Sequence, residues 1–241
     1  IAVIGYNTAG SPDNFAILVL KTLTEGTTFY VNDNEVASDG GTAFTDLGER
    51  EASFTVKAGQ SIPAGTVIVL PWGQGAVSTA TYDWSTTTSA GFGNNSEEIY
   101  LYTAADINAT TPTAFIYGVR IGTSPSARPA GLVAGTTFIT PPPSGTLAAS
   151  RYKTSGAIYT GTTNALLAAI GDVANNWQTA ASYTLIAGDW TFSFVTPAAE
   201  PTTQASGVNF ANVTASQMDV SWSSGNGANR LVICRAGSAP A

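Results

Sequence analysis

The sequence predicts a mainly β protein: an antiparallel β-sandwich with one short peripheral helix, followed by a linker and part of a second β module. Apolar residues come in short runs rich in β-branched and aromatic side chains, and Gly, Pro, Asn and Asp bound these runs. Only 10% of the 241 residues are charged, whereas 44% are apolar. Such a chain buries a substantial core and covers its surface with Thr, Ser, Gly and Asn, as stiff secreted β proteins do.

The expected strands follow these runs along the chain. In order they are residues 2–6, 15–23, 27–31, 52–56, 66–72, 97–104, 113–121, 136–140 and 190–195. Three of them follow a shared pattern of an apolar residue, two further residues, Gly-Thr and then the strand, at 23–31, 62–70 and 132–140. Glycine adopts the positive φ that a tight turn before a strand requires. The strands at short spacing favour a sandwich.

One segment departs from the strand pattern. Within "TNALLAAIGDVANNWQ" (163–178), Leu166, Leu167, Ile170 and Val173 recur at helical intervals behind a Thr or Asn that can cap a helix. We expect a short helix whose apolar stripe packs against the end of the sandwich.

The second module begins after a change in composition. The stretch "TPAAEPTTQAS" (196–206) lacks apolar periodicity and contains two prolines, which is typical of a linker. Beyond it, "MDVSW" alternates apolar and polar residues, a Gly-Asn-Gly turn follows at 225–227, and "RLVIC" resumes the apolar pattern. The predicted organisation is therefore a sandwich over 1–196, a linker over 197–205 and a partial module over 206–241.

Composition excludes several functions. Nine Lys and Arg stand against sixteen Asp and Glu, and the basic residues are scattered, so nucleic acid is not an expected partner. Histidine is absent and Cys234 is the one cysteine, which rules out the common Ser-His and Cys-His triads, His-bound zinc and an internal disulfide. No run reaches the roughly 18 apolar residues of a membrane span. We therefore expect neither enzymatic activity nor membrane insertion.

Paired carboxylates offer the remaining route to catalysis, of the glycosidase kind. Glu97 and Glu98 are adjacent in an expected strand, so they point to opposite faces and do not share a site. Glu49 and Glu51 can share a face, but exposed charges on an edge strand explain them equally well. The sequence therefore favours a protein without a catalytic site.

Oxygen-bearing side chains gather after the second strand, in "NDNEVASD" (32–39). Asp33, Asn34, Glu35 and Asp39, together with Asn32, are candidate ligands of a structural Ca²⁺, which takes six to eight oxygens in proteins. The spacing is not that of an EF-hand. Asn and Asp also end strands by bonding to their own backbone, so turn formation is the competing interpretation.

Four aromatic residues lie in or beside Gly-, Ser- and Thr-rich stretches: Trp72, Tyr82, Trp84 and Phe92. Exposed aromatic rings stack on sugars, so these residues are candidates for a polysaccharide-binding surface. The alternative is that they are buried and close one end of the sandwich.

Two stretches resemble known families. The segments "PTTQAS", "NVTASQMDVSW" and "GNGANRLVICRAG" resemble the opening of fibronectin type III-like repeats in secreted proteins of Bacteroidetes-type bacteria. Those repeats run on for several more strands, so we expect the module to be incomplete at Ala241. Its open edge is then covered by further chain or by another chain.

The first 196 residues resemble a lamin tail-like β-sandwich module of the same surface proteins. The matching stretches are "SPDNFAILVLKTLTEGTTFYVNDNE", "GQSIPAGTVIVL", "NSEEIYLYTA" and "TNALLAAIGDVANNWQT". After the second strand that family more often has Thr-Asp-Asn and an aromatic-containing loop, whereas this chain has "NDNEVASDGG".

Together these features predict a non-catalytic structural and adhesive protein, secreted to a bacterial cell surface. Its expected partners are other copies of itself or neighbouring domains of the same surface protein, joined into a fibre through strand edges. No cofactor is expected, and the one candidate is a structural calcium at the Asp33–Asp39 stretch, for which turn formation is the competing interpretation. The alternative is a carbohydrate-binding accessory module of a larger secreted enzyme, with polysaccharide as the partner.

Overall fold

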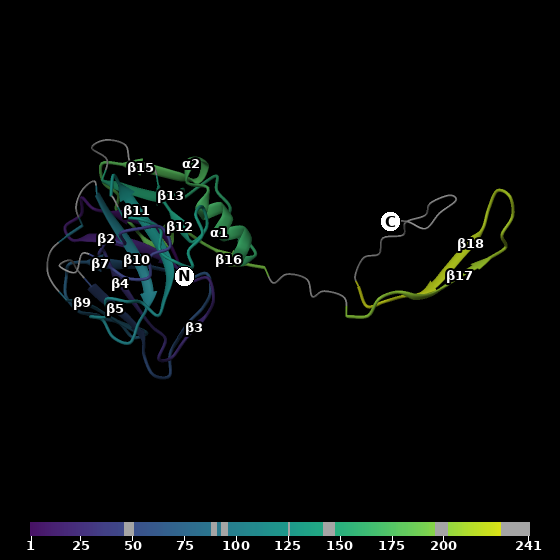
Figure 1. Cartoon of the computed structure of the whole chain (residues 1–241), viewed down its shortest axis with the longest axis horizontal. Helices are drawn as coiled ribbons and strands as arrows, with labels where there is room; N and C mark the ends of the chain where they lie inside the picture. The colour runs from purple at the N-terminus through teal and green to yellow at the C-terminus, as the bar shows by residue number, and fades with distance from the viewer. Residues whose placement is uncertain are drawn as a thin grey trace. The chain divides into compact units, whose positions relative to one another are not determined.

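The protein is mainly β and antiparallel with little helix, which confirms the predicted fold class. A computed structural model describes residues 1–45, 51–87, 91–92, 96–124, 126–141, 148–195 and 202–227. The chain divides into two compact units, Ile1–Val195 and Thr196–Ala241 (Figure 1).

The first sheet of the larger unit has five strands, all antiparallel, in the order β15-β13-β1-β2-β7. Their bounds are β1 Ala2–Asn7, β2 Asp13–Leu18, β7 Val67–Trp72, β13 Ala149–Tyr152 and β15 Trp177–Ala180. The central strand β1 is buried at every position and β2 at all but one. These two strands therefore form the inside of the unit rather than a surface.

The second sheet has seven strands in the order β12-β11-β10-β4-β5-β9-β8. Their bounds are β4 Thr28–Asn32, β5 Glu51–Val56, β8 Val77–Ser78, β9 Tyr82–Thr86, β10 Ser96–Thr103, β11 Ala114–Gly122 and β12 Phe138–Ile139. All neighbours pair antiparallel except β11 and β12, which are parallel.

The main core lies between the two sheets. In β5 and β7 buried residues alternate with partly exposed ones, because successive side chains of a strand point to opposite faces. Phe54 of β5 and Leu70 of β7 are both fully buried in this core. The period of two in the sequence therefore decides which face of each strand turns inward.

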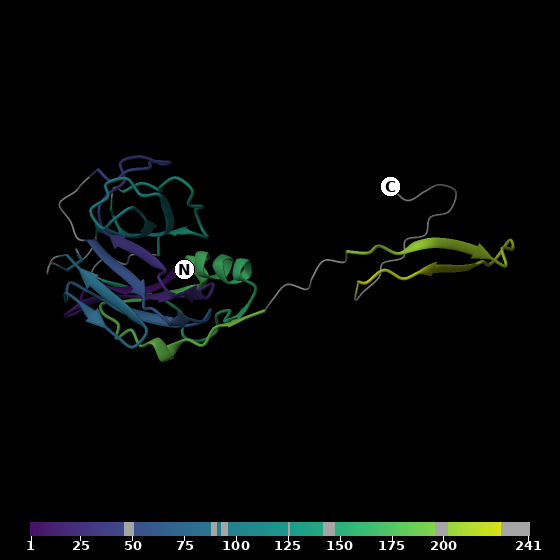
Figure 2. The same ribbon diagram turned by 90° about the horizontal axis from the view of Figure 1, so that it is seen from below.

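A second, smaller core covers the outer face of the seven-stranded sheet. Ile99 and Leu101 of β10 belong to the main core, whereas the alternating Tyr100 and Tyr102 face the second one. The other buried members of the second core are Val36, Phe44, Leu132 and Phe138. Val36, Phe44 and Leu132 come from the connections 33–45 and 126–137, which Figure 2 shows on one side of the sheet, and Phe138 begins β12.

Backbone hydrogen bonds tie these two connections to each other. Ala127 N donates to Val36 O over 2.8 Å, and Gly40 N donates to Arg128 O over 2.8 Å. The Tyr100 hydroxyl bonds Ser126 and Ala127 O, which anchors the layer to the sheet. The residues after β4 therefore form part of a packed layer and are not a free loop.

The predicted helix is present as α1, Thr163–Gly171, followed by a short turn of helix α2, Val173–Asn176. Thr162 is its N-cap and accepts a hydrogen bond from Ala165 N, as the sequence indicates. Leu166 and Ile170 are buried in the main core. The expected helix ends two residues early, because Trp177 begins β15.

Short elements complete the larger unit. They are β3 Leu23–Thr24 paired with β6 Ser61–Ile62, β14 Thr160–Gly161 paired with β16 Ser193–Phe194, and the 3₁₀ turn η1 Ala187–Asp189. The expected strand 190–195 is thus reduced to two residues. Trp190 and Phe192 instead reach the core from an irregular segment that follows η1.

The smaller unit contains one antiparallel hairpin, β17 Ser206–Ala211 and β18 Asp219–Ser223. Cys234 and the run 230–234 lie outside the described residues, as do Glu49, Arg50 and most of the expected linker. Within the ranges given above, no helix is long and apolar enough to cross a membrane.

Candidate functional site

Three of the four aromatic candidates for sugar binding lie inside the protein. Trp72, Trp84 and Phe92 are 1%, 0% and 5% exposed, and all three surround Phe15 of β2. Trp72 and Phe92 stack at 4.7 Å with almost parallel rings. The prediction of an exposed stacking surface is therefore wrong for these three residues, which are part of the core.

Trp84 is buried because it lies on a strand that the sequence analysis missed. It pairs with Phe54 in the β5–β9 register, so both rings point into the main core. Its indole N–H donates to Pro71 O over 2.9 Å, which satisfies the one polar atom of the side chain. The strand was missed because "YDWST" (82–86) is short and mostly polar.

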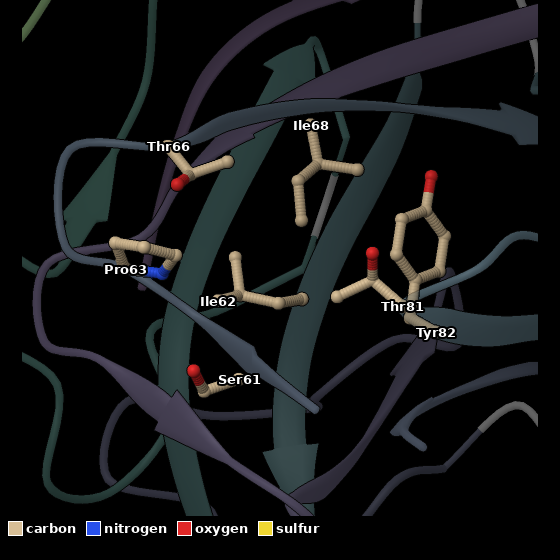
Figure 3. A pocket seen from close by; sticks show the side chains of 7 residues that line it. All are labelled: Ser61, Ile62, Pro63, Thr66, Ile68, Thr81 and Tyr82. Atoms are coloured by element: carbon tan, nitrogen blue, oxygen red, sulfur yellow. The ribbon is translucent and has the colours of Figure 1, made fainter. Parts of the chain in front are cut away.

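Tyr82 is the fourth candidate and differs from the others, since it is only partly buried and lines a groove at the surface. The groove is about 190 Å³ in volume, and Figure 3 shows its side chains around a common space. Its lining is Ser61, Ile62, Pro63, Thr66, Ile68, Thr81 and Tyr82, all uncharged. The Tyr82 ring stacks on Phe54 at 4.7 Å, which fixes its position.

The proposed calcium ligands are dispersed over the second core. Asp33 and Asn34 are buried, Glu35 is half-buried, and Asp39 is exposed. The Asp39 carboxylate accepts from Arg128 N over 2.9 Å and lies 3.9 Å from the Arg128 guanidinium. In the part of the chain that the structure describes, no three Asp, Glu, His or Cys side chains lie together as a metal group.

A different polar cluster lies beside these residues, and the sequence analysis missed it. Asn32, at the end of β4, is opposite Glu51 on β5 and opposite Tyr100 on β10. Tyr102, two residues from Tyr100, is on the same face. Asn32 is 1% exposed, and neither atom of its amide has a hydrogen-bond partner.

Electrostatics link this cluster to a turn that follows β10. Burial raises the pKa of Glu51, the Asn34 side chain opposes the shift as a hydrogen-bond donor, and the Asp106 carboxylate adds to it. Burial also raises the pKa of Tyr102, and the Glu51 carboxylate contributes in the same direction. The cluster is therefore partly desolvated, and charges of both signs act on it, because the Arg120 guanidinium opposes the rise in the pKa of Tyr100.

The paired glutamates have structural positions. Glu97 and Glu98 are adjacent on β10, and Glu98 is 2% exposed on the face that carries Tyr100. Glu98 pairs across the strands with Arg120 and accepts a hydrogen bond from the Ser124 hydroxyl. These contacts join β10 to β11 and to the residues that follow β11.

The hairpin of the smaller unit has one apolar face. Phe210 pairs with Val220, and Val208 and Trp222 fall on the same side because side chains alternate along a strand. Val208 and Phe210 are 60% and 58% exposed, and Trp222 is 36% exposed. Asn209 pairs with Ser221 on the opposite face. The hairpin is thus amphipathic, and its apolar side is open to solvent.

Comparison of this chain with protein-family models, with curated proteins and with solved structures found no match.

Proposed function

We propose that this chain is a non-catalytic, extracellular structural and adhesive part of a bacterial cell-surface protein. The observation that supports this proposal is the open apolar face of the β17–β18 hairpin. A face of this kind packs against a second β layer, as in every β-sandwich. In a surface assembly, a second copy of the protein supplies that layer.

The energetics favour such an assembly. A two-stranded hairpin alone is marginally stable in water, because its strands have no layer on which to bury their apolar side chains. Burying one large apolar side chain contributes about 1.5–3 kcal/mol. Covering Val208, Phe210 and Trp222 together therefore gives a substantial driving force for association.

The larger unit suits the role of a rigid spacer. The indole N–H groups of Trp84, Trp177 and Trp190 each donate to a backbone carbonyl, over 2.9, 2.7 and 3.0 Å. Each of these bonds joins a large buried ring to a backbone segment elsewhere in the fold. Such a densely connected interior supports a passive mechanical function.

The experiment compares the natural full-length protein with a Phe210→Ser variant by sedimentation velocity and negative-stain electron microscopy. The native protein is expected to form filaments or oligomers. Loss of one buried phenylalanine weakens each contact by roughly ten- to a hundredfold. The matched control is Asn209→Ala, on the polar face of the same strand, which leaves assembly unchanged.

Two results would contradict the proposal. Dispersed monomers of the native protein at high concentration exclude assembly through this face. Turnover of polysaccharide, ester, phosphoester or peptide substrates excludes a non-catalytic function.

The groove at Tyr82 favours a second candidate, a carbohydrate-binding accessory module. Its lining combines apolar side chains with the hydroxyls of Ser61, Thr66 and Thr81 and carries no charge, which suits a neutral sugar. Its volume of about 190 Å³ is below the range of drug-sized sites, so a single ring is the expected occupant. A glycan array tests this candidate: binding that Tyr82→Ala abolishes supports it, and the absence of any signal excludes it.

A further inference from the structure

The five-stranded sheet ends on one side at a strand of full length. This last strand, β7, has six residues and pairs with β2. Pro71 has no N–H, so it cannot form a mutually hydrogen-bonded pair with Asn14, which lies opposite it. Hydrogen-bonded and non-hydrogen-bonded pairs alternate along antiparallel strands, so Val67 and Val69 also turn their N–H and C=O groups away from β2.

Two hydrogen bonds show which way the backbone of β7 faces. The Thr66 carbonyl accepts from the N–H of Val19, the residue after β2, over 2.9 Å. The Pro71 carbonyl accepts from the Trp84 indole N–H on the other side of the strand. In the part of the chain that the structure describes, no hydrogen bond reaches the backbone of the two valines from outside β2. This edge therefore offers two N–H groups and two C=O groups to an incoming strand.

The groove described above lies directly beside this edge. Ile68, between the two valines, points from β7 into the groove, and Thr81 and Tyr82 line it from the start of β9 (Figure 3). Ile62 and Ile68 also belong to the main core, so the groove opens onto the core at the edge of the sandwich. In an added strand, the residue opposite Ile68 has its Cβ about 5 Å from that of Ile68 and points to the same face. Its side chain therefore enters the groove and extends the core.

The lining decides which side chain fits. None of the seven lining residues is charged. Lys57 and Asp83 are not part of the lining and pair with each other at 3.3 Å. A charged side chain in the groove would lose hydration without gaining a partner of opposite charge. The volume of about 190 Å³ has room for one side chain, so a single apolar residue such as valine is the expected occupant.

We propose that the edge of β7 binds an extended segment of another protein chain by antiparallel strand addition. The segment hydrogen-bonds Val67 and Val69 and places one uncharged, apolar side chain in the groove opposite Ile68. Backbone pairing supplies the affinity, and the groove selects the side chain. The pairing stops at Pro71, which has no N–H and whose C=O is occupied by Trp84, so the contact is short and weak. The inference does not depend on the hairpin contact proposed above.

Titration of the isotope-labelled full chain with the peptide Ac-KSTVTSK-NH₂, followed by nuclear magnetic resonance, tests the proposal. The central valine of the peptide is designed to lie opposite Ile68, and its two threonines then pair with Val67 and Val69. The amide signals of these two protein residues are expected to shift most, because they gain hydrogen bonds. Replacing the peptide valine by aspartate should weaken binding at least about tenfold, since the groove offers a carboxylate no partner.

Methylation of the peptide backbone separates strand pairing from simple filling of the groove. Methyl groups on both threonine nitrogens keep every side chain but remove the N–H groups that face β7, so binding should weaken at least about tenfold. The matched control carries its methyl group on the valine nitrogen, which points away from β7, and should bind within about twofold of the parent peptide. A sugar-like occupant of the groove would need neither N–H group.

A protein variant tests the same edge from the other side. Val69→Pro removes one N–H from the edge and leaves the pairing with β2 in place, as Pro71 does two residues further on. It should weaken peptide binding at least about fivefold, and Val133→Ser, at an exposed valine outside β7, should leave binding unchanged. If Val69→Pro does not fold, the methylated peptides still decide the question. The proposal is overturned if the Val67 and Val69 amides do not shift up to the solubility limit of the peptide, or if methylation of the threonines leaves the affinity unchanged.

Discussion

Replacing Trp84 by alanine tests whether this residue is part of the core or part of a binding surface. Trp84 is 0% exposed, contacts Phe15 at 5.8 Å between ring centroids, and donates its indole N–H to Pro71 O. Truncation of a buried tryptophan to alanine costs about 3–5 kcal/mol, and the carbonyl left without its donor adds about 1 kcal/mol. We therefore expect the free energy of unfolding to fall by about 5 kcal/mol.

Urea denaturation followed by far-ultraviolet circular dichroism measures this loss. Trp84→Phe keeps an aromatic ring but removes the hydrogen bond, so the expected loss is about 1–2 kcal/mol, within reach even if the alanine variant does not fold. Trp222→Ala is the control, because this tryptophan lies on the exposed face of the separate hairpin. A loss of less than about 1 kcal/mol for Trp84→Ala would refute the buried position, since only an exposed side chain is so tolerant.

Three further predictions concern the larger unit. Burial raises the pKa of the Tyr6 hydroxyl from 10.0 to about 12. Because the unfolded chain loses this proton at lower pH than the folded protein, the free energy of unfolding falls by up to about 2.7 kcal/mol between pH 10 and 12. In Tyr6→Phe, the urea midpoint should therefore fall less steeply with pH over this range. Gly118→Ala places a Cβ 2.8 Å from the Phe138 ring, so urea denaturation should show a loss of about 1–3 kcal/mol in the free energy of unfolding. Gly188→Ala is the control, because its added Cβ has no atom within 4 Å and should leave stability unchanged. Thr162→Ala removes the cap of α1 and lowers stability by about 1 kcal/mol in thermal unfolding, and Thr162→Ser should restore it.

Local patterns predicted much of the fold. The strands β5 and β7 follow from their period of two, and α1 follows from its apolar spacing and its threonine cap. The strands β9, β13 and β15 were missed, because they are short and carry polar residues. Only pairing with neighbouring strands makes such segments extended, and local sequence carries little information about that pairing.

The candidate sites were less predictable, since they depend on contacts between distant residues. The sequence places Asn32, Asp33 and Asn34 in one oxygen-rich stretch, but the β4–β5 register decides that Asn32 is opposite Glu51. The Asp106 carboxylate, more than 50 residues after Glu51, also raises the pKa of Glu51. The exposure of the aromatic residues could not be predicted from the sequence either, because Trp84 lies on a short, mostly polar strand that local patterns do not indicate.

The seven-stranded sheet stops on both sides at a strand of two residues, β8 and β12. A growing fibril adds chains by pairing with a long row of free N–H and C=O groups, and a strand this short provides very few of them. The seven-stranded sheet therefore offers a second copy little edge on which to add strands, and we expect it to resist edge-to-edge merging.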